Sequence, residues 1–420
     1  MNYAEFLERK LKHYAGAGFD VPIESLNTNL FDFQKYIVRL ALSKARYAIF
    51  ADCGLGKTLM QLEWANQINK QTGMPVLIFC PLAVSAQTIE EGERFGIKVT
   101  HYGIGDIQII NYDQIDNITA HQFGGVVLDE SSILKNFTGE TKKKILDVFS
   151  KTQYKLCCTA TPSPNDDMEI CNHAEFLGQG KSSEVLAMYF THDGGETQKW
   201  RLKGHARKRF WNFVKTWSCF VSNPSDLGFD GSKFILPKLN LIDIDVQSPI
   251  RDGRLFNDVH VSAINFNQEL RDTKEARLNE AIEIANKNKG QFIIWVKQNE
   301  EADYLSERLT DFREVRGSDS TEKKERDLMD FAHGKYRILV TKAKIAQFGL
   351  NFQNCHNQIF ASLDFSFEGT YQAIRRSYRF GQKKPVNVYM ITTDSMSNVI
   401  GAIRKKQDQF EVMKYHLTTN

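Results

Sequence analysis

Short apolar runs of strand length alternate with segments of helical periodicity along most of the chain. In the first half these runs lie at residues 47–51, 76–80, 98–101, 107–110, 126–128 and 154–159. In the second half they lie at residues 292–296, 338–341, 358–361 and 386–391. Apolar positions three and four residues apart predict helices at residues 57–71, 300–309, 321–333, 367–380 and 396–416, the last with Ser395 as N-cap. Strands that alternate with helices predict a parallel α/β fold.

One segment, residues 165–252, interrupts this alternation. It contains the glycine-rich turns HDGG and NPSDLG and then LPKLN, so we expect a helical insertion followed by a crossing segment. A chain of 420 residues is also too long for one ordinary core. We therefore predict an N-terminal domain at residues 1–165, the insertion and crossing segment at 166–252, and a C-terminal domain at 253–420.

The composition, with 42% hydrophobic and 25% charged residues, is ordinary for a soluble globular protein. No apolar run approaches the roughly 18 residues of a membrane span, and the N-terminal MNYAEFLERK has no apolar signal region. Seven cysteines at irregular spacing argue against a disulfide framework and against a zinc site. We expect a cytoplasmic protein without a membrane partner. The net charge of +3 is too small to indicate a nucleic-acid partner by itself.

The sequence ADCGLGKT directly follows the first predicted strand and opens the first predicted helix. Gly54 and Gly56 let the backbone curl so that successive N–H groups point at a phosphate chain, and the helix dipole favours the same anion. Lys57 can reach the terminal phosphates, and the Thr58 hydroxyl can hold a magnesium ion. A plain glycine turn explains neither Lys57 nor Thr58. The loop, with Leu55 between its glycines, therefore predicts a nucleotide site.

Two carboxylates follow the predicted strand in VVLDESSILKN. Ligands bind at this edge of parallel sheets, so we expect Asp129 to hold magnesium and Glu130 to orient and deprotonate an attacking water. The alternative is a solvated acidic turn. In CTATPSP, Thr159 and Thr161 supply short hydroxyl groups that can contact the neighbouring carboxylates, although a strand-to-loop turn explains them equally well.

The second half has a basic cluster in QAIRRSYRFGQ. On the predicted helix, Gln372, Arg375, Arg376 and Arg379 share one broad face, and Gly381 is placed to stop the helix. This face is either a solvated surface or a source of fixed positive charge for a phosphate.

The insertion has its own basic run, KWRLKGHARKRFWNF. We expect its aromatic side chains to pack inward and Arg207, Lys208 and Arg209 to contact nucleic-acid phosphates. The alternative is an amphipathic helix whose cations face water.

Taken together, these segments resemble the superfamily-two helicases, and most closely the Swi/Snf-type double-stranded DNA translocases. LIFCPL is similar to that family's second motif, DES followed by ILKN resembles its DEAH-ILKN segment, and TATP resembles its GTP or ATP motif. Phe33 and Gln34 resemble the adenine-reading glutamine motif, and residues 340–389 resemble the last two motifs. The resemblance covers residues 29–393, apart from some of the insertion.

The resemblance implies two RecA-like parallel-sheet domains in tandem, separated by the helical insertion, with ATP and Mg²⁺ as cofactors. It implies that Gln34 reads adenine, that Arg376 and Arg379 complete the ATP site, and that four residues hold and hydrolyse ATP: Lys57, Thr58, Asp129 and Glu130. For DNA, it places Pro81 and Leu82 beside a phosphate-contacting turn. It assigns Gly349 and Asn351 to the motif that contacts the DNA backbone.

Four positions depart from the family pattern. Ala51 stands at the start of the phosphate loop, Ser131 and Ser132 replace Ala-His after the carboxylates, and Arg375 occupies a position where the family has glycine. KIAQF, at residues 344–348, is longer than the family's glycine pair. The lost histidine at Ser132 puts the coupling between ATP chemistry and the TATP segment in question.

From these observations we expect an ATP-dependent DNA translocase of compact bacterial or phage type. It would act as a monomer in a bacterial cell or an infected host cell, with duplex DNA as the favoured partner and room for an unidentified protein partner. Two alternatives stay open: an ATP-switched DNA clamp or assembly factor that does not move along DNA, and an RNA helicase.

Overall fold

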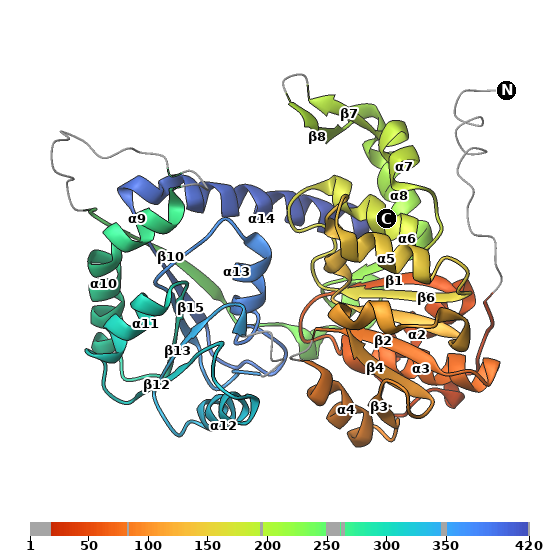
Figure 1. Ribbon diagram of the computed structural model, residues 1–420, viewed down its shortest axis with the longest axis horizontal. Helices are drawn as coiled ribbons and strands as arrows, with labels where there is room; N and C mark the ends of the chain where they lie inside the picture. Colours follow the sequence, from red (N-terminus) through yellow and green to blue (C-terminus); the bar gives the residue numbers. More distant parts are fainter. Residues whose placement is uncertain are drawn as a thin grey trace. The chain divides into compact units, whose positions relative to one another are not determined.

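The computed structural model describes residues 18–81, 84–193, 196–248, 261, 265–345 and 351–418. The chain divides into two compact units (Figure 1). Unit 1 comprises Met1–Lys233 and Gln409–Asn420, and unit 2 comprises Phe234–Asp408. Within the described residues, no helix combines the length and the apolar character needed to cross a membrane.

Unit 1 contains a sheet of seven parallel strands in the order β3-β4-β2-β5-β6-β1-β9. Its strands are β1 (Arg46–Ala51), β2 (Val76–Cys80), β3 (Val99–His101), β4 (Ile107–Asn111), β5 (Gly125–Asp129), β6 (Tyr154–Thr159) and β9 (Ser218–Val221). Every residue of β2, β5 and β6 is buried, as expected when helices cover both faces of a parallel sheet. The six strands predicted for this half are confirmed, whereas β9 was not predicted.

The helices of unit 1 connect these strands. They are α2 (Asp32–Lys44), α3 (Lys57–Thr72), α4 (Ser85–Arg94), α5 (Glu140–Val148), α6 (Ile170–Phe176), α7 (Ser182–Tyr189) and α8 (Arg207–Trp217). Between α7 and α8 an antiparallel hairpin, β7 (Phe190–Asp193) and β8 (Glu196–Leu202), extends from the helices (Figure 1). The segment expected to be a helical insertion thus also contains strands.

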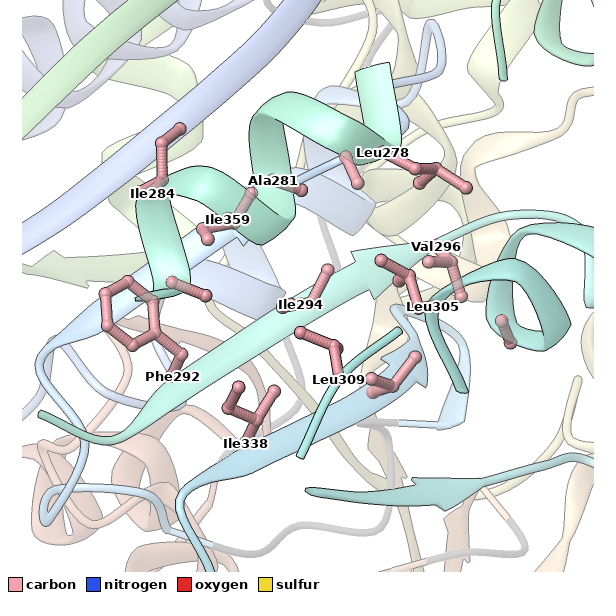
Figure 2. Close-up of a cluster of buried hydrophobic side chains, with 14 of the residues drawn as sticks. Leu278, Ala281, Ile284, Phe292, Ile294, Val296, Leu305, Leu309, Ile338 and Ile359 are labelled. Carbon is pink, nitrogen blue, oxygen red and sulfur yellow. The ribbon is translucent and has the colours of Figure 1, made fainter. Parts of the chain in front are cut away.

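Unit 2 contains six parallel strands in the order β10-β15-β14-β11-β13-β12. They are β10 (Leu239–Val246), β11 (Phe292–Val296), β12 (Phe312–Val315), β13 (Ile338–Lys342), β14 (Asn357–Phe360) and β15 (Val386–Thr393). The helices are α9 (Phe266–Asp272), α10 (Lys274–Lys287), α11 (Asn299–Ser306), α12 (Thr321–Ala332) and α13 (Phe367–Ile374). Figure 2 shows the core on one face of the sheet, where Leu278 of α10, Ile294 of β11 and Leu305 of α11 meet.

Some predictions at helix ends are wrong, and the helix predicted for residues 300–309 is α11, which ends at Ser306. The helix predicted for residues 367–380 ends at Ile374, where the Gln358 side-chain amide donates to the Ile374 carbonyl at 3.1 Å. The last helix, α14 (Ser397–Thr418), begins after a 3₁₀ turn at Asp394–Met396. Ser395 therefore does not cap it, and its buried hydroxyl instead donates to the Glu269 carboxylate.

Candidate nucleotide-binding site

The phosphate loop connects β1 to α3 at the carboxyl end of the sheet in unit 1. Its two glycines have left-handed backbones, with φ of 90° at Gly54 and 77° at Gly56. A Cβ at Gly56 would also lie 2.3 Å from the side-chain nitrogen of Gln34. Both positions therefore need glycine, and Gly56 directly precedes the first turn of α3, whose N–H groups have no partner within the helix.

The Lys57 side chain bonds back to the first residue of the phosphate loop. Its ammonium donates a hydrogen bond to the Ala51 carbonyl at 2.8 Å, and its charge lowers the pKa of the nearby Asp129 carboxyl. The loop is closed further by backbone bonds from Leu55 N–H to the Asp52 carbonyl at 3.3 Å and from Asp52 N–H to the Val221 carbonyl at 2.9 Å. The unpredicted strand β9 thus helps to fix the loop.

Gln34 lies on α2 against the same loop and is only 4% exposed. Its side-chain nitrogen donates to the Leu55 carbonyl at 2.8 Å, and its side-chain oxygen accepts from the Phe31 N–H at 2.8 Å. Each end of the amide therefore holds one bond to the protein and keeps one further hydrogen or lone pair. Adenine reading by Gln34 stays a prediction, and the geometry adds a second role in holding the loop.

The two predicted carboxylates lie at the carboxyl end of β5. Burial, followed by the neighbouring Glu130 charge, raises the pKa of Asp129 to about 7. Glu130 has a left-handed backbone with φ of 51°, and its carboxylate accepts a hydrogen bond from the Thr159 hydroxyl at 3.2 Å. The Thr159 hydroxyl in turn accepts from the Thr161 N–H at 3.1 Å. The structure therefore brings the DES and TATP segments together.

The residues here fit a magnesium ion that arrives with a nucleotide. The Thr58 hydroxyl and the Asp129 carboxylate are hard oxygen donors, which this ion prefers. Among the described residues, no group of three or more His, Cys, Asp and Glu side chains could hold a metal ion by itself. Magnesium is usually bound by one or two protein oxygens together with water and phosphate oxygens, so this sparse donor set suits it.

Two buried residues at this edge were not predicted from the sequence. Tyr112, in the 3₁₀ helix Tyr112–Asn117 after β4, donates its hydroxyl to the Asp129 carbonyl at 2.6 Å. His173, on α6, has its Nε2 3.1 Å from the Ser131 hydroxyl. Tyr112 directly follows an apolar strand, which is the signal that identified Asp129 and Glu130. His173 stands alone in a helix, and no spacing pattern marks it.

The arginine cluster belongs to unit 2 and does not lie on one helix face. Because α13 ends at Ile374, Arg376 and Arg379 lie in the turns after it and are partly buried. Arg375 is 9% exposed, with its guanidinium 5.5 Å from the Tyr371 ring and 5.3 Å from the Tyr378 ring. Arg375 is therefore a packing residue rather than part of a solvated surface.

The FGQ sequence after the arginines anchors these turns. The Gln382 side-chain amide donates to the carbonyls of Gln353, Cys355 and Ser377 at 3.0–3.3 Å. Gly381 has φ of 93°, and a Cβ there would lie 2.9 Å from the Gln353 side chain. Gly381 thus permits a tight turn, although it does not end a helix as predicted.

Comparisons with known proteins agree with this architecture. Residues 273–381 match the model of the helicase conserved C-terminal domain. Over this segment the chain is therefore similar to helicases. Its fold is also similar to that of S. cerevisiae Dbp5 bound to RNA and ADP BeF3, with a TM-score of 0.58, 15% identity, and coverage of 92% of this chain and 93% of that one. The predicted fold of two RecA-like domains is confirmed.

The chain is also similar to two curated proteins over part of its length. The Mus musculus DNA annealing helicase and endonuclease ZRANB3 is 26% identical over 177 residues, which are 37% of this chain and 16% of the mouse protein. Protein p41 of Acyrthosiphon pisum secondary endosymbiont phage 1 is 27% identical over 183 residues, which are 36% of this chain and 39% of the phage protein. The chain spans between 7% and 39% of the length of the curated relatives that it matches.

The predicted nucleic-acid contacts of this chain lie on several elements. On α8, Lys208 and Arg209 are exposed and Arg207 is partly buried, whereas the four aromatic side chains Phe210, Trp211, Phe213 and Trp217 are buried. Pro81 is partly buried after β2, and Asn351 is exposed beside Phe352, whose N–H donates to the Arg376 carbonyl at 2.9 Å. Leu82 and Gly349 lie outside the described residues. Phosphate contact by all of these stays a prediction.

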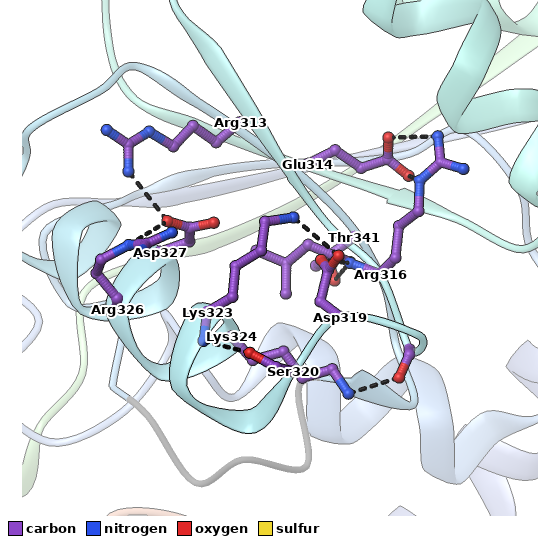
Figure 3. A network of polar contacts seen from close by, with 12 residues as sticks. Arg313, Glu314, Arg316, Asp319, Ser320, Lys323, Lys324, Arg326, Asp327 and Thr341 are labelled. Carbon is purple, nitrogen blue, oxygen red and sulfur yellow. Dashed lines mark hydrogen bonds and ion pairs between the residues drawn. The ribbon is translucent and has the colours of Figure 1, made fainter.

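A second charged region lies around β12 and α12 (Figure 3). Arg313 pairs with Asp327 at 3.1 Å and Asp330 at 3.0 Å, while Asp319 pairs with Lys323 at 2.8 Å. Opposite charges alternate here and neutralise one another within the network. Because Arg313, Asp319, Lys323, Asp327 and Asp330 are paired with one another, we assign no ligand to this region.

Proposed function

We propose that this chain hydrolyses ATP at the sheet edge of unit 1, with arginines supplied by unit 2, and uses the cycle to move along DNA. The observation that carries the proposal is the convergence at one sheet edge of the phosphate loop, Lys57, Asp129 and the Glu130–Thr159 pair. Each of these groups acts on a phosphate chain or on the water that attacks it.

Each residue of the site has a separate proposed role in hydrolysis. The loop N–H groups and Lys57 bind the phosphates, and Glu130 orients the attacking water and accepts its proton. Thr58 and Asp129 would hold Mg²⁺, which when bound neutralises phosphate charge. Since the pKa of Asp129 is about 7 even with the Lys57 charge nearby, this carboxyl is poorly stabilised as an anion until a further cation arrives. A site of this kind favours the arrival of a cation with the nucleotide.

Arg376 and Arg379 are the proposed contribution of unit 2. They lie in turns pinned by Gln382 and by the Phe352 bond to the Arg376 carbonyl, so their backbone positions are well fixed. Arginines that stabilise a transferring phosphoryl group are worth about 10³ to 10⁵ in turnover. Arg375, which packs between tyrosines, is not proposed for this role.

DNA is favoured over RNA as the partner for two reasons. FGQ followed by KKPV resembles the DNA-translocating branch of the family, and the name of the mouse relative describes a DNA annealing helicase. Exposed Lys208 and Arg209 on α8 are available for phosphate contacts in a monomer. ATP turnover measured with duplex DNA, single-stranded DNA and RNA tests this choice. Stimulation by RNA alone would establish the RNA-helicase alternative.

A second candidate function is an ATP-switched clamp that binds DNA without moving. Ser132, which stands where the family has a histidine, favours it because that side chain couples hydrolysis to the TATP segment in the family. Displacement of a third strand from a DNA triplex separates the two functions. A translocase displaces the strand only with ATP, whereas a clamp binds the duplex and displaces nothing.

A further inference from the structure

Glu130 has a left-handed backbone conformation, which is unfavourable for a residue with a side chain. Only three non-glycine residues among those described have positive φ, namely Ala45, Glu130 and Asp311. A left-handed backbone crowds the Cβ of an L-residue, so it persists only where surrounding contacts impose it. In Glu130 the left-handed turn re-aims the side chain at the carboxyl end of β5, where its carboxylate meets the Thr159 hydroxyl.

The peptide before Glu130 is fixed by Tyr112. The Tyr112 hydroxyl donates to the Asp129 carbonyl at 2.6 Å, and that carbonyl belongs to the peptide unit that links Asp129 to Glu130. The ring itself is buried and stacks on Phe79 with centroids 5.4 Å apart. Because the packed ring holds the hydroxyl in place, this bond restrains the orientation of the peptide plane and hence φ of Glu130.

The residue after Glu130 is fixed by His173. The fully buried Ser131 hydroxyl lies 3.1 Å from Nε2 of the fully buried His173. The His173 ring meets Phe50 edge-on, at a centroid distance of 5.4 Å. Burial lowers the pKa of His173 to about 4, so the ring is neutral near pH 7 and bonds Ser131 without adding a positive charge.

We propose that Tyr112 and His173 are positioning residues that clamp Glu130 from its two flanks. The inference rests on the proposed role of Glu130 as the base for hydrolysis. The Tyr112–Asp129 and Ser131–His173 contacts enter from different elements, the 3₁₀ helix after β4 and α6, and each fixes one neighbour of the strained residue. Ser131 lies in the segment where the family pattern Ala-His is lost, and in this chain its hydroxyl contacts His173.

The first test is Tyr112→Phe, which removes the hydroxyl and keeps the ring on Phe79. Tyr336→Phe is the matched control, because the buried Tyr336 hydroxyl also donates to a backbone carbonyl, that of Asp327, at 2.7 Å in unit 2. We expect Tyr112→Phe to lower kcat for ATP by about tenfold to a hundredfold, since small misplacements of a reacting group are that costly. KM for ATP should stay within about twofold to threefold of the parent for a loss confined to the reacting geometry.

The control should lose a similar amount of thermal stability and keep the parent's kcat. If Tyr112→Phe keeps the parent's kcat, as the control should, the proposed clamp is wrong. An equal fall of kcat in both would overturn the clamp as well, because it would report general destabilisation.

The second test is a double-mutant cycle at the other flank. Ser131→Ala and His173→Leu should each lower kcat, and the double variant should be no slower than the worse single variant, because both remove one contact. His173→Gln, which restores an amide hydrogen-bonding group, should recover part of kcat. Additive losses, or no recovery in His173→Gln, would show that His173 only fills the core.

Glu130→Gln in the same assay separates this inference from the proposed function. If Glu130→Gln keeps the parent's turnover, Glu130 is not the base. The proposed function of this site is then wrong, and the clamp, which rests on it, is wrong as well. If Glu130→Gln is inactive while the clamp variants keep full kcat, the proposed function stands and only the clamp is wrong. Ser131→Ala, a small change at a buried site, keeps the test valid should the His173 variants fail to fold.

Discussion

Replacing Asp129 by asparagine should stabilise the ligand-free protein while abolishing its activity. The pKa of Asp129 is raised from 3.8 to about 7, first because the carboxyl is buried and second because Glu130 is charged nearby. In the folded state the group therefore keeps its proton between these pH values, whereas the unfolded chain releases it. The folded state binds more protons in this window, so folding stability falls as pH rises from about 4 to about 7.

The size of this effect follows from the shift. A difference of about 3 pKa units, at about 1.4 kcal/mol each, destabilises the folded state by about 4 kcal/mol above pH 7. The cost is absent below the unfolded pKa, where both states are protonated. Asparagine has nearly the same shape and no charge, so Asp129→Asn removes this cost. For a unit of this size, each kcal/mol corresponds to about 2 °C or more in Tm, giving about 8 °C at pH 8.

The assay is thermal unfolding of the parent and Asp129→Asn from pH 5 to pH 8, without nucleotide and with a chelator. The increase in Tm of Asp129→Asn over the parent should be largest at pH 8 and should shrink toward pH 5. Asp327→Asn serves as control, because Asp327 is equally buried but lies 3.1 Å from Arg313 and should gain nothing. The reasoning is refuted if Asp129→Asn is no more stable than the parent at pH 8, or if its gain is the same at both ends of the range.

Further predictions concern the arginines, the basic run and the core. Alanine at Arg376 or Arg379 should lower ATP turnover by about 10³-fold or more with little change in ATP affinity, which stopped-flow binding and steady-state rates together would check. Neutralising Arg207, Lys208 and Arg209 should flatten the salt dependence of duplex binding by a slope of about 0.9 per lost contact, with ATP hydrolysis unchanged without DNA. Arg277→Met should destabilise unit 2 by about 3–5 kcal/mol in urea unfolding, because it leaves Glu301 charged and fully buried without its partner at 2.9 Å.

The strands at the centre of each sheet could be predicted because all their residues are buried. β2, β6 and β11 have the predicted bounds, since continuous apolar runs have few other structures available. Two of the strands that were missed, β10 and β12, have weaker patterns. β10 alternates exposed and partly buried residues at the edge of its sheet, and β12 reads FREV with two charges, so neither resembles a buried strand.

Some residues of the candidate site could be predicted from the sequence and others could not. Lys57, Asp129 and Glu130 could be found because they follow apolar strands, and the sheet brings the ends of its strands together. The end of α13 could not be predicted, since the helical spacing of the arginines continues past Ile374, whereas the chain after it forms turns held by distant side chains such as Gln358 and Gln382. His173 was equally hidden, because a single histidine in an apolar helix gives no sign of its contact with Ser131.

ATP turnover by the Glu130→Gln protein in saturating duplex DNA tests the central claim most directly. If Glu130 deprotonates the attacking water at the sheet edge of unit 1, this variant should bind ATP as tightly as the parent. Its DNA-stimulated turnover should be almost lost, since the amide cannot accept the proton. Turnover at the parent's rate, with ATP still bound, would contradict the proposed mechanism and would move the catalytic base to another residue.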